Sequence, residues 1–258
     1  MLALPAMEFL RAEYTEVWVP SAVVPLVRFA DRVRSIASTG LDLLGLPEVA
    51  APARLLTDLA GFDSIISWYG SQRPEFRAAL PGAVFLDALP PPGGSTHCAD
   101  FFARQVGAAM PARSRVTVHP AFETRAVLHP FSGSRRKNWP LPRYRELAQR
   151  LACPVEWCAG PEESLPEARR FDNLYELATW MAGSRVYVGN DSGITHVAAA
   201  AGARVVAIFG PTDPAVWAPR GPHVRILYGQ HGQLETISVD EVLHAIDSLS
   251  DSGLPFSR

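Results

Sequence analysis

The sequence has little that would direct the chain to nucleic acid or across a membrane. Its 24 Lys and Arg residues nearly balance 26 Asp and Glu residues, and the formal net charge is −2. Scattered charge of both signs argues against a nucleic-acid-binding surface. No apolar run approaches the ~18 residues of a membrane-spanning helix. The first residues lack a basic segment followed by an apolar core, so we expect no secretory signal peptide.

Cysteine is equally scarce. Cys98, Cys153 and Cys158 are odd in number, and none has the spacing of metal ligands. We therefore expect free thiols, a reducing compartment and a cytoplasmic location. Asp191 and Asp213 have no third ligand at a convincing spacing, so we expect no metal site and a metal-independent protein.

Lysine is nearly absent, because Lys137 is the only lysine and every other basic side chain is arginine. It lies in the loop Ser132-Gly-Ser-Arg-Arg-Lys-Asn138, which follows an apolar strand predicted at residues 126–129. Ligands in open α/β sheets bind at such strand ends. Small residues let backbone amides approach a phosphate, and a compact ammonium on a flexible stem suits a diphosphate. A solvated basic turn is the alternative interpretation.

The most informative stretch is residues 185–213. Two apolar runs, 186–188 and 205–209, are typical of buried parallel strands, and 195–201 has the small side chains of a thin helix. The turn residues Asn190-Asp-Ser-Gly193 are good helix N-caps. Unpaired amides of the first helical turn and the helix macrodipole would favour an anion there. An ordinary capped helix is the alternative.

Strands and helices alternate along the whole chain, which predicts an α/β fold with parallel sheets. Residues 110–124 contain prolines and charges without a period, so we expect them to join two domains, residues 1–115 and 116–258. Strands are predicted at 16–20, 33–36, 64–68, 83–86, 126–129, 155–158, 186–188, 205–209 and 224–227. Helices are predicted at 1–14, 25–30, 53–60, 74–80, 99–109, 142–151, 174–182, 195–201 and 239–249.

Four motifs occur in order along the C-terminal half: His129-Pro-Phe-Ser-Gly-Ser-Arg-Arg-Lys-Asn-Trp-Pro140, Ala159-Gly-Pro-Glu162, Asn190-Asp-Ser-Gly-Ile-Thr-His-Val-Ala-Ala-Ala200 and Phe209-Gly-Pro-Thr-Asp-Pro214. Together they resemble glycosyltransferase family 9, the family of the bacterial lipopolysaccharide heptosyltransferases. The resemblance implies a GT-B fold with two facing Rossmann-like domains, the N-terminal one shortened. It also implies a sugar donor held mainly by the C-terminal domain.

The reaction that the resemblance implies is transfer of a sugar, a heptose, from a nucleoside-diphosphate sugar. ADP-heptose would be the co-substrate, with no further cofactor. The acceptor would be a lipopolysaccharide core or another cell-surface glycan, reached at the cytosolic face of the inner membrane. No oligomeric state is predicted.

The resemblance also assigns roles to residues. Lys137 and Asp191 are the expected catalytic residues, and the turn 160–162 is expected near the nucleoside. The expected donor contacts are Ser132, Gly133, Ser134, Lys137, Gly160, Pro161, Glu162, Asp191, Ser192, Gly193 and His196.

The N-terminal residues resemble the family less closely. In the family, a Leu-Pro-Ala run follows a Gly-Asp turn whose aspartate acts as the general base. Leu4-Pro-Ala6 matches that run. The resemblance therefore implies that the first strand, the turn and the base lie upstream of Met1.

Other functions stay open on the sequence. A catalytically impaired relative would bind the nucleotide sugar without transferring it. An epimerase or hydrolase would need paired acid and base carboxylates, which the sequence does not indicate. A dinucleotide dehydrogenase would need a Gly-x-Gly-x-x-Gly turn, and neither half opens with one.

Overall fold

The computed structural model describes residues 1–46 and 49–249, which form two compact units. One unit is Pro5–Ala112, and the other combines Met1–Leu4 with the chain from Arg113 onward. The division falls inside the stretch 110–124, where the sequence predicts a join. No helix within the described ranges is both long and apolar enough to cross a lipid bilayer.

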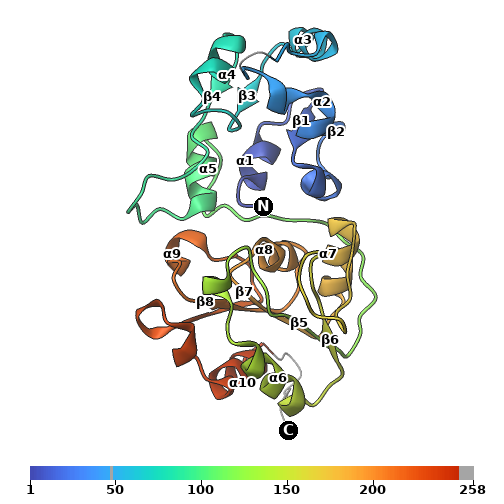
Figure 1. Ribbon diagram of the computed structural model, residues 1–258, viewed down its shortest axis with the longest axis vertical. Coiled ribbons are helices and arrows are strands. Elements are labelled where there is room, and N and C mark those ends of the chain that lie inside the picture. The colour runs from blue at the N-terminus through green and yellow to red at the C-terminus, as the bar shows by residue number, and fades with distance from the viewer. Residues whose placement is uncertain (47–48, 250–258) are drawn as a thin grey trace. The chain divides into compact units, whose positions relative to one another are not determined.

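The C-terminal unit is built on one five-stranded parallel sheet, whose order is β6-β5-β7-β8-β9 (Figure 1). Every residue of β5, β7 and β8 is buried, because inner strands of a parallel sheet are covered on both faces. The strands are β5 (Ala126–His129), β6 (Val155–Trp157), β7 (Val186–Asn190), β8 (Val205–Phe209) and β9 (Val224–Tyr228).

Helices cover both faces of this sheet (Figure 1). On one face α10 packs against α6, β8 and β9, and on the other α8 packs against α7, β7 and β8. Trp139, Tyr144 and Ile246 lie in the core of the α6–α10 face and are almost completely buried. The helices are α6 (Leu141–Arg150), α7 (Leu174–Ala182), α8 (Gly193–Ala200), α9 (Pro214–Trp217) and α10 (Val239–Asp247).

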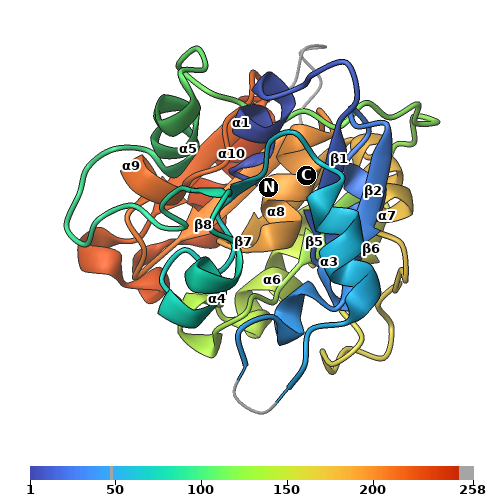
Figure 2. The same ribbon diagram turned by 90° about the horizontal axis from the view of Figure 1, so that it is seen from above.

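The N-terminal unit has two separate parallel sheets of two strands each among its described residues, not the single sheet expected of a Rossmann-like domain. β1 (Glu16–Val19) pairs with β2 (Arg32–Ser35), and the two lie side by side in Figure 1 and Figure 2. β3 (Ile66–Ser67) pairs with β4 (Val84–Phe85). The helices are α1 (Leu4–Phe9), α2 (Ile36–Thr39), α3 (Ala53–Ala60), α4 (Pro74–Ala79) and α5 (Cys98–Val106).

Aromatic packing holds the N-terminal unit together. Phe76 of α4 is fully buried and makes edge-on contacts with the rings of Tyr69 and Phe85, at centroid distances of 5.5 and 6.0 Å. Trp18 and Phe85 are partly buried against the same apolar cluster. Side chains thus connect the two small sheets, although no backbone ladder joins them.

Most predicted elements are confirmed to within a few residues, and the largest errors lie near the N-terminus. The predicted helix 1–14 is shorter, Leu4–Phe9. The predicted helix 25–30 is wrong, because the chain forms a 3₁₀ helix, η1 (Ser21–Leu26), and residues 27–30 are not helical. Strand β7 continues through Gly189 and Asn190, where the sequence predicts its end. The elements that the sequence did not predict are α2, α9, η2 (Leu41–Leu43), η3 (Arg135–Lys137), η4 (Gln230–Gly232) and η5 (Leu234–Thr236).

The three cysteines are free thiols, as expected. Burial raises the pKa of Cys98 to about 11 and that of Cys158 to about 12. Burial also raises the pKa of the half-buried Cys153. All three are therefore protonated at neutral pH and are poor nucleophiles.

We expect Gly189→Ala to destabilise the C-terminal unit. A Cβ atom at Gly189 would lie 2.4 Å from the hydroxyl oxygen of Tyr187, whose side chain is fully buried. Overpacking of this kind costs about 1–3 kcal/mol. Denaturant unfolding should show a lower midpoint for this variant.

Gly133→Ala is the matched control, because a Cβ atom there would meet nothing within 4 Å. Equal midpoints for the two variants would contradict the steric explanation.

Candidate functional site

The strand order of the C-terminal sheet places its topological switch point between β5 and β7. Taken in chain order, β6-β5-β7-β8-β9 reads 2-1-3-4-5, so the connections leave β5 and β7 in opposite directions. Ligands of open α/β sheets bind at such a switch point, beyond the carboxyl ends of the strands. The loop with Lys137 follows β5, and Asp191 follows β7. Both polar segments therefore lie at the carboxyl-terminal ends of the strands, on the same side of the sheet.

Lys137 and Asp191 form an ion pair at this switch point. The Nζ atom of Lys137 donates a hydrogen bond to Oδ2 of Asp191 at 2.7 Å. The Lys137 side chain is 32% exposed and that of Asp191 only 8%, so the ammonium is the accessible member of the pair. The backbone amide of Asp191 bonds to the carbonyl of Ile208 on β8 at 2.9 Å, which fixes the carboxylate to the sheet.

Thr212 is the residue that the sequence did not assign to the site. Its hydroxyl donates to the same Oδ2 atom of Asp191 at 2.6 Å. It belongs to the motif Phe209–Pro214, which carries the family resemblance but received no role. Three loops, after β5, β7 and β8, thus meet at one carboxylate oxygen. These three loops are close only because β5, β7 and β8 are neighbours in the sheet, and this strand order cannot be read from a single sequence.

Asn190 anchors the lysine loop to β7. Its side chain is completely buried, and its Oδ1 atom accepts hydrogen bonds from the amide of Trp139 at 2.9 Å and the hydroxyl of Tyr144 at 3.1 Å. The indole of Trp139 donates to the carbonyl of Ile237 at 3.0 Å. The loop is therefore held at its Trp139 end, two residues after Lys137.

The predicted phosphate contacts in this loop differ in their surroundings. The hydroxyl of Ser132 lies 2.8 Å from the carbonyl of Ser134 and 2.7 Å from Oδ1 of Asn138, so it bonds within its own loop. Gly133 is exposed and has open space beside it. The amide of Lys137 bonds to the carbonyl of Ser134 at 2.9 Å, which closes η3 and sets the direction of the lysine stem.

The first turn of α8 lies at the same edge. Ser192 caps the helix, because its Oγ atom accepts from the amide of Thr195 at 3.3 Å. The amides of Gly193 and Ile194 have no acceptor within the helix, since an α-helix leaves its first four N–H groups unpaired. His196 is half-buried on this turn. Gly202 follows the C-cap with φ of +86°, as predicted for this helix end.

Glu163, which the sequence did not single out, makes polar contacts that shape the loop after β6. Its Oε2 atom accepts from the amide of Gly160 at 2.6 Å and lies 3.2 Å from Nε2 of the buried His129. Burial opposes the ionisation of Glu163, but the hydrogen bonds from His129 and Gly160 outweigh it, and its pKa is lowered. Pro161 and Glu162 are exposed. Glu163 thus ties this loop to the end of β5.

The arrangement suits the neutralisation of a negatively charged group. It offers the accessible ammonium of Lys137, held in place by Asp191, and the first-turn amides of Gly193 and Ile194. Across the part of the chain that the structure describes, no three His, Cys, Asp or Glu side chains cluster closely enough to hold a metal ion.

Comparison with known proteins identifies the family. The model of glycosyltransferase family 9 (heptosyltransferase) matches residues 105–245. Lipopolysaccharide heptosyltransferase 1 of Salmonella typhimurium is 32% identical over 95 residues, which cover 31% of this chain and 30% of that protein. The Escherichia coli protein of the same name is 29% identical over 130 residues, 44% of this chain and 40% of that protein. The matches therefore span about a third of the length of these relatives.

Solved structures share the fold over nearly the whole chain. E. coli heptosyltransferase WaaC with ADP aligns with a TM-score of 0.64 at 15% identity, covering 96% of this chain and 95% of that one. E. coli ADP-heptose LPS heptosyltransferase II aligns with a TM-score of 0.69 at 16% identity, covering 96% and 94%. The predicted α/β fold of GT-B type is confirmed. Because the family model covers more than half of the chain, the protein belongs to glycosyltransferase family 9, the heptosyltransferase family.

Proposed function

We propose that the protein transfers a heptose from ADP-heptose to a lipopolysaccharide-core-like acceptor. Family membership supports glycosyl transfer, and the names of the similar proteins support a heptose and ADP. The acceptor would be met at the cytosolic face of the inner membrane. The observation on which the proposal depends is the Lys137–Asp191 ion pair at the β5/β7 switch point.

The chemistry follows from the charge that develops during transfer. When the glycosidic bond breaks, the nucleoside diphosphate leaves with additional negative charge. The ammonium of Lys137 and the first-turn amides of α8 would then interact more strongly with the transition state than with the ground state. Asp191 would orient the lysine through their hydrogen bond.

The nucleoside is proposed to lie over the loop after β6. Parallel strands place the Gly160 turn at the same sheet edge as Lys137, with β5 between β6 and β7. Glu163 fixes the shape of this turn through Gly160 and His129. Ser132, Gly133, Ser134, Ser192, Gly193 and His196 are proposed to line the rest of the donor site.

Donor selectivity is the first test. Ligand that binds only the folded protein raises the unfolding temperature. In a thermal-shift series we expect ADP-heptose and ADP to raise this temperature more than GDP-sugars or UDP-sugars do. Equal shifts for all three nucleotides would argue against an adenine-specific site. Donor binding without transfer to any glycan acceptor would indicate a binding protein and not a transferase.

Lys137→Ala should lower kcat by about 10²–10³-fold, the usual loss when one hydrogen-bond donor to the transition state is removed. The unfolding midpoint should stay close to that of the wild type, since the lysine stem is partly exposed. Steady-state kinetics with the donor and acceptor measure the effect. Arg145→Ala removes an exposed cation from α6 and serves as the control. An unchanged rate in Lys137→Ala would refute the role of the lysine.

Thr212 offers a test of whether the orientation of Asp191, the partner of Lys137, matters for transfer. Thr212→Val keeps the shape of the side chain but removes its hydrogen bond to Asp191. A hydrogen bond to a charged group contributes about 1.5–3 kcal/mol, so we expect kcat to fall by roughly ten- to a hundredfold. Thr212→Ser retains the hydroxyl and should keep most of the rate. Equal rates for the valine and serine variants would show that the hydroxyl has no part in positioning Asp191.

A further inference from the structure

Three hydroxyl groups meet beneath the first turn of α8, and one of them comes from the sheet. The phenol oxygen of Tyr187 on β7 lies 3.2 Å from Oγ1 of Thr195, and Oγ of Ser192 lies 3.1 Å from the same atom. Oγ1 of Thr195 also lies 2.5 Å from the carbonyl oxygen of Asn190. Tyr187 and Thr195 are completely buried. They cannot touch a donor themselves, so any role in binding it acts through the turn above them.

The direction of each hydrogen bond follows from the number of protons. A hydroxyl group has one proton to donate, and a backbone carbonyl can only accept. Thr195 therefore donates its proton to the carbonyl of Asn190, and its oxygen accepts from its other two neighbours. The hydroxyl groups of Tyr187 and Ser192 both donate to Thr195. Both paths of protons thus end on the backbone at the end of β7.

This arrangement turns the hydroxyl of Ser192 away from any ligand. Its proton bonds inward to Thr195, and its oxygen accepts the amide of Thr195 at 3.3 Å. The Ser192 side chain therefore has no proton left for an anion. The first-turn amides of Gly193 and Ile194 remain, because an α-helix leaves these N–H groups unpaired. A diphosphate at this turn would be bound by backbone N–H groups.

Gly189 makes room for the phenol group of Tyr187. Residues 187 and 189 lie on the same face of β7, because side chains alternate along a strand. A Cβ atom at Gly189 would lie 2.4 Å from the hydroxyl oxygen of Tyr187 and 2.8 Å from the adjacent ring carbon. The ring thus extends over the glycine to the turn at the end of the strand. Burial raises the pKa of Tyr187, so the phenol keeps the proton that it donates.

Asn190 connects the hydroxyl cluster to the lysine loop. Its backbone carbonyl accepts from Thr195, and its side-chain Oδ1 atom accepts from the amide of Trp139, two residues after Lys137. One buried residue therefore takes part in holding both α8 and the lysine loop. The hydroxyl cluster fixes the side of this connection that faces α8.

We propose that Tyr187 and Thr195 are positioning residues for the diphosphate of the donor. Their hydroxyl groups hold the Ser192 cap and the Asn190 carbonyl in one arrangement, which directs the first-turn amides of α8 at the anion. The inference rests on the proposed function, because it assumes a diphosphate at this turn. A buried hydroxyl adds little net stability and is costly without a partner, whereas phenylalanine would fill the same space. The hydroxyl of Tyr187 is therefore better explained by orientation than by packing.

The test compares the dissociation constants of ADP and adenosine, measured by NMR titration. Adenosine lacks the diphosphate, so the ratio of the two constants isolates the contribution of the phosphates. In Thr195→Val we expect the Kd of ADP to rise by about tenfold, while that of adenosine changes by less than about twofold. Thr195→Ser keeps the hydroxyl and should bind ADP like the wild type. A purely structural role would affect both ligands alike.

Tyr187→Phe tests the sheet end of the cluster. Alone, it should raise the Kd of ADP by about threefold, because Thr195 keeps its bond to Asn190. In the Thr195→Val background it should have no further effect, since the phenol then has no hydroxyl to bond. Tyr175→Phe and Thr179→Val are matched controls. Each removes a hydroxyl of α7 that donates to a backbone carbonyl, and neither should change the ratio.

The outcomes separate this inference from the proposed function. If the wild type binds ADP but Thr195→Val leaves the ratio of the two constants unchanged, the inference is wrong and the proposed function stands. An equal loss in Thr195→Ser, or additive effects of the two substitutions, would also overturn it. If Thr195→Val does not fold, the ratio in Tyr187→Phe decides. A wild type that does not bind ADP would refute the proposed function, and the inference with it.

Discussion

The Oδ2 atom of Asp191 brings the loops of the candidate site together in the C-terminal unit. Lys137 and Thr212 both bond to it, and they arrive on loops that follow β5 and β8. Each loop has its own constraint, because Asn190 holds the first through Trp139 and the buried β8 fixes the start of the second. The ion pair is partly buried, so its geometry depends on these hydrogen bonds more than on charge alone. Loss of any one of these hydrogen bonds would leave the backbone of the loops in place but would change the orientation of the Lys137 and Asp191 side chains.

Much of the C-terminal unit is predictable from the sequence because its signals are local. The apolar strands β5 and β8, the capped helix α8 and the glycine after it are confirmed in position. The resemblance also selected Lys137 and Asp191, which the structure brings within 2.7 Å. Their catalytic role stays a prediction, as do the donor contacts of the remaining residues.

What the sequence did not predict depends on pairing between distant segments. Thr212 contacts Asp191 only because β8 pairs with β7. Glu163 and Glu162 are equivalent in the sequence, and only the contact with His129 in the folded chain distinguishes Glu163. One-turn elements such as α2, α9 and η3 were missed because three or four residues carry no measurable period. Gly189 was predicted to end its strand, but it lies inside β7, where the absence of a side chain leaves room for the ring of Tyr187.

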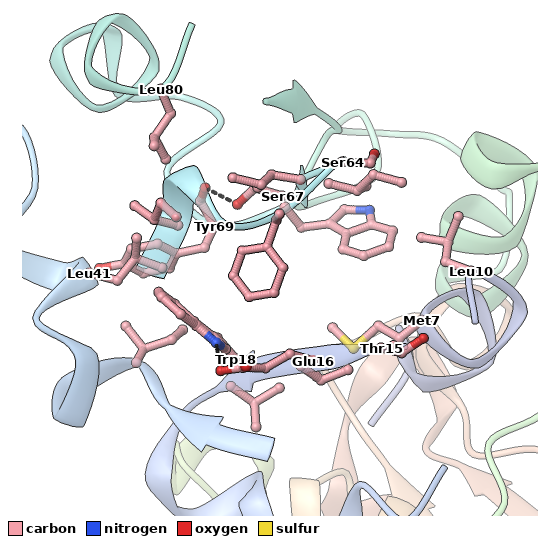
Figure 3. A pocket seen from close by; sticks show the side chains of 18 of the residues that line it. Met7, Leu10, Thr15, Glu16, Trp18, Leu41, Ser64, Ser67, Tyr69 and Leu80 are labelled. Atoms are coloured by element: carbon pink, nitrogen blue, oxygen red, sulfur yellow. Dashed lines mark hydrogen bonds between the residues drawn. The ribbon is translucent and has the colours of Figure 1, made fainter. Parts of the chain in front are cut away.

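The two units follow the same architectural rule to different degrees. In the C-terminal unit every inner strand has two partners, and the strand order reverses between β5 and β7, the strands that precede Lys137 and Asp191. Among the described residues of the N-terminal unit, β1 and β3 each pair with one strand, and the cavity that both strands line (Figure 3) contains buried polar atoms of Asp42 and Trp68 without hydrogen-bond partners. No continuous backbone ladder therefore joins the two small sheets, and this unit depends on the aromatic packing around Phe76 for its cohesion.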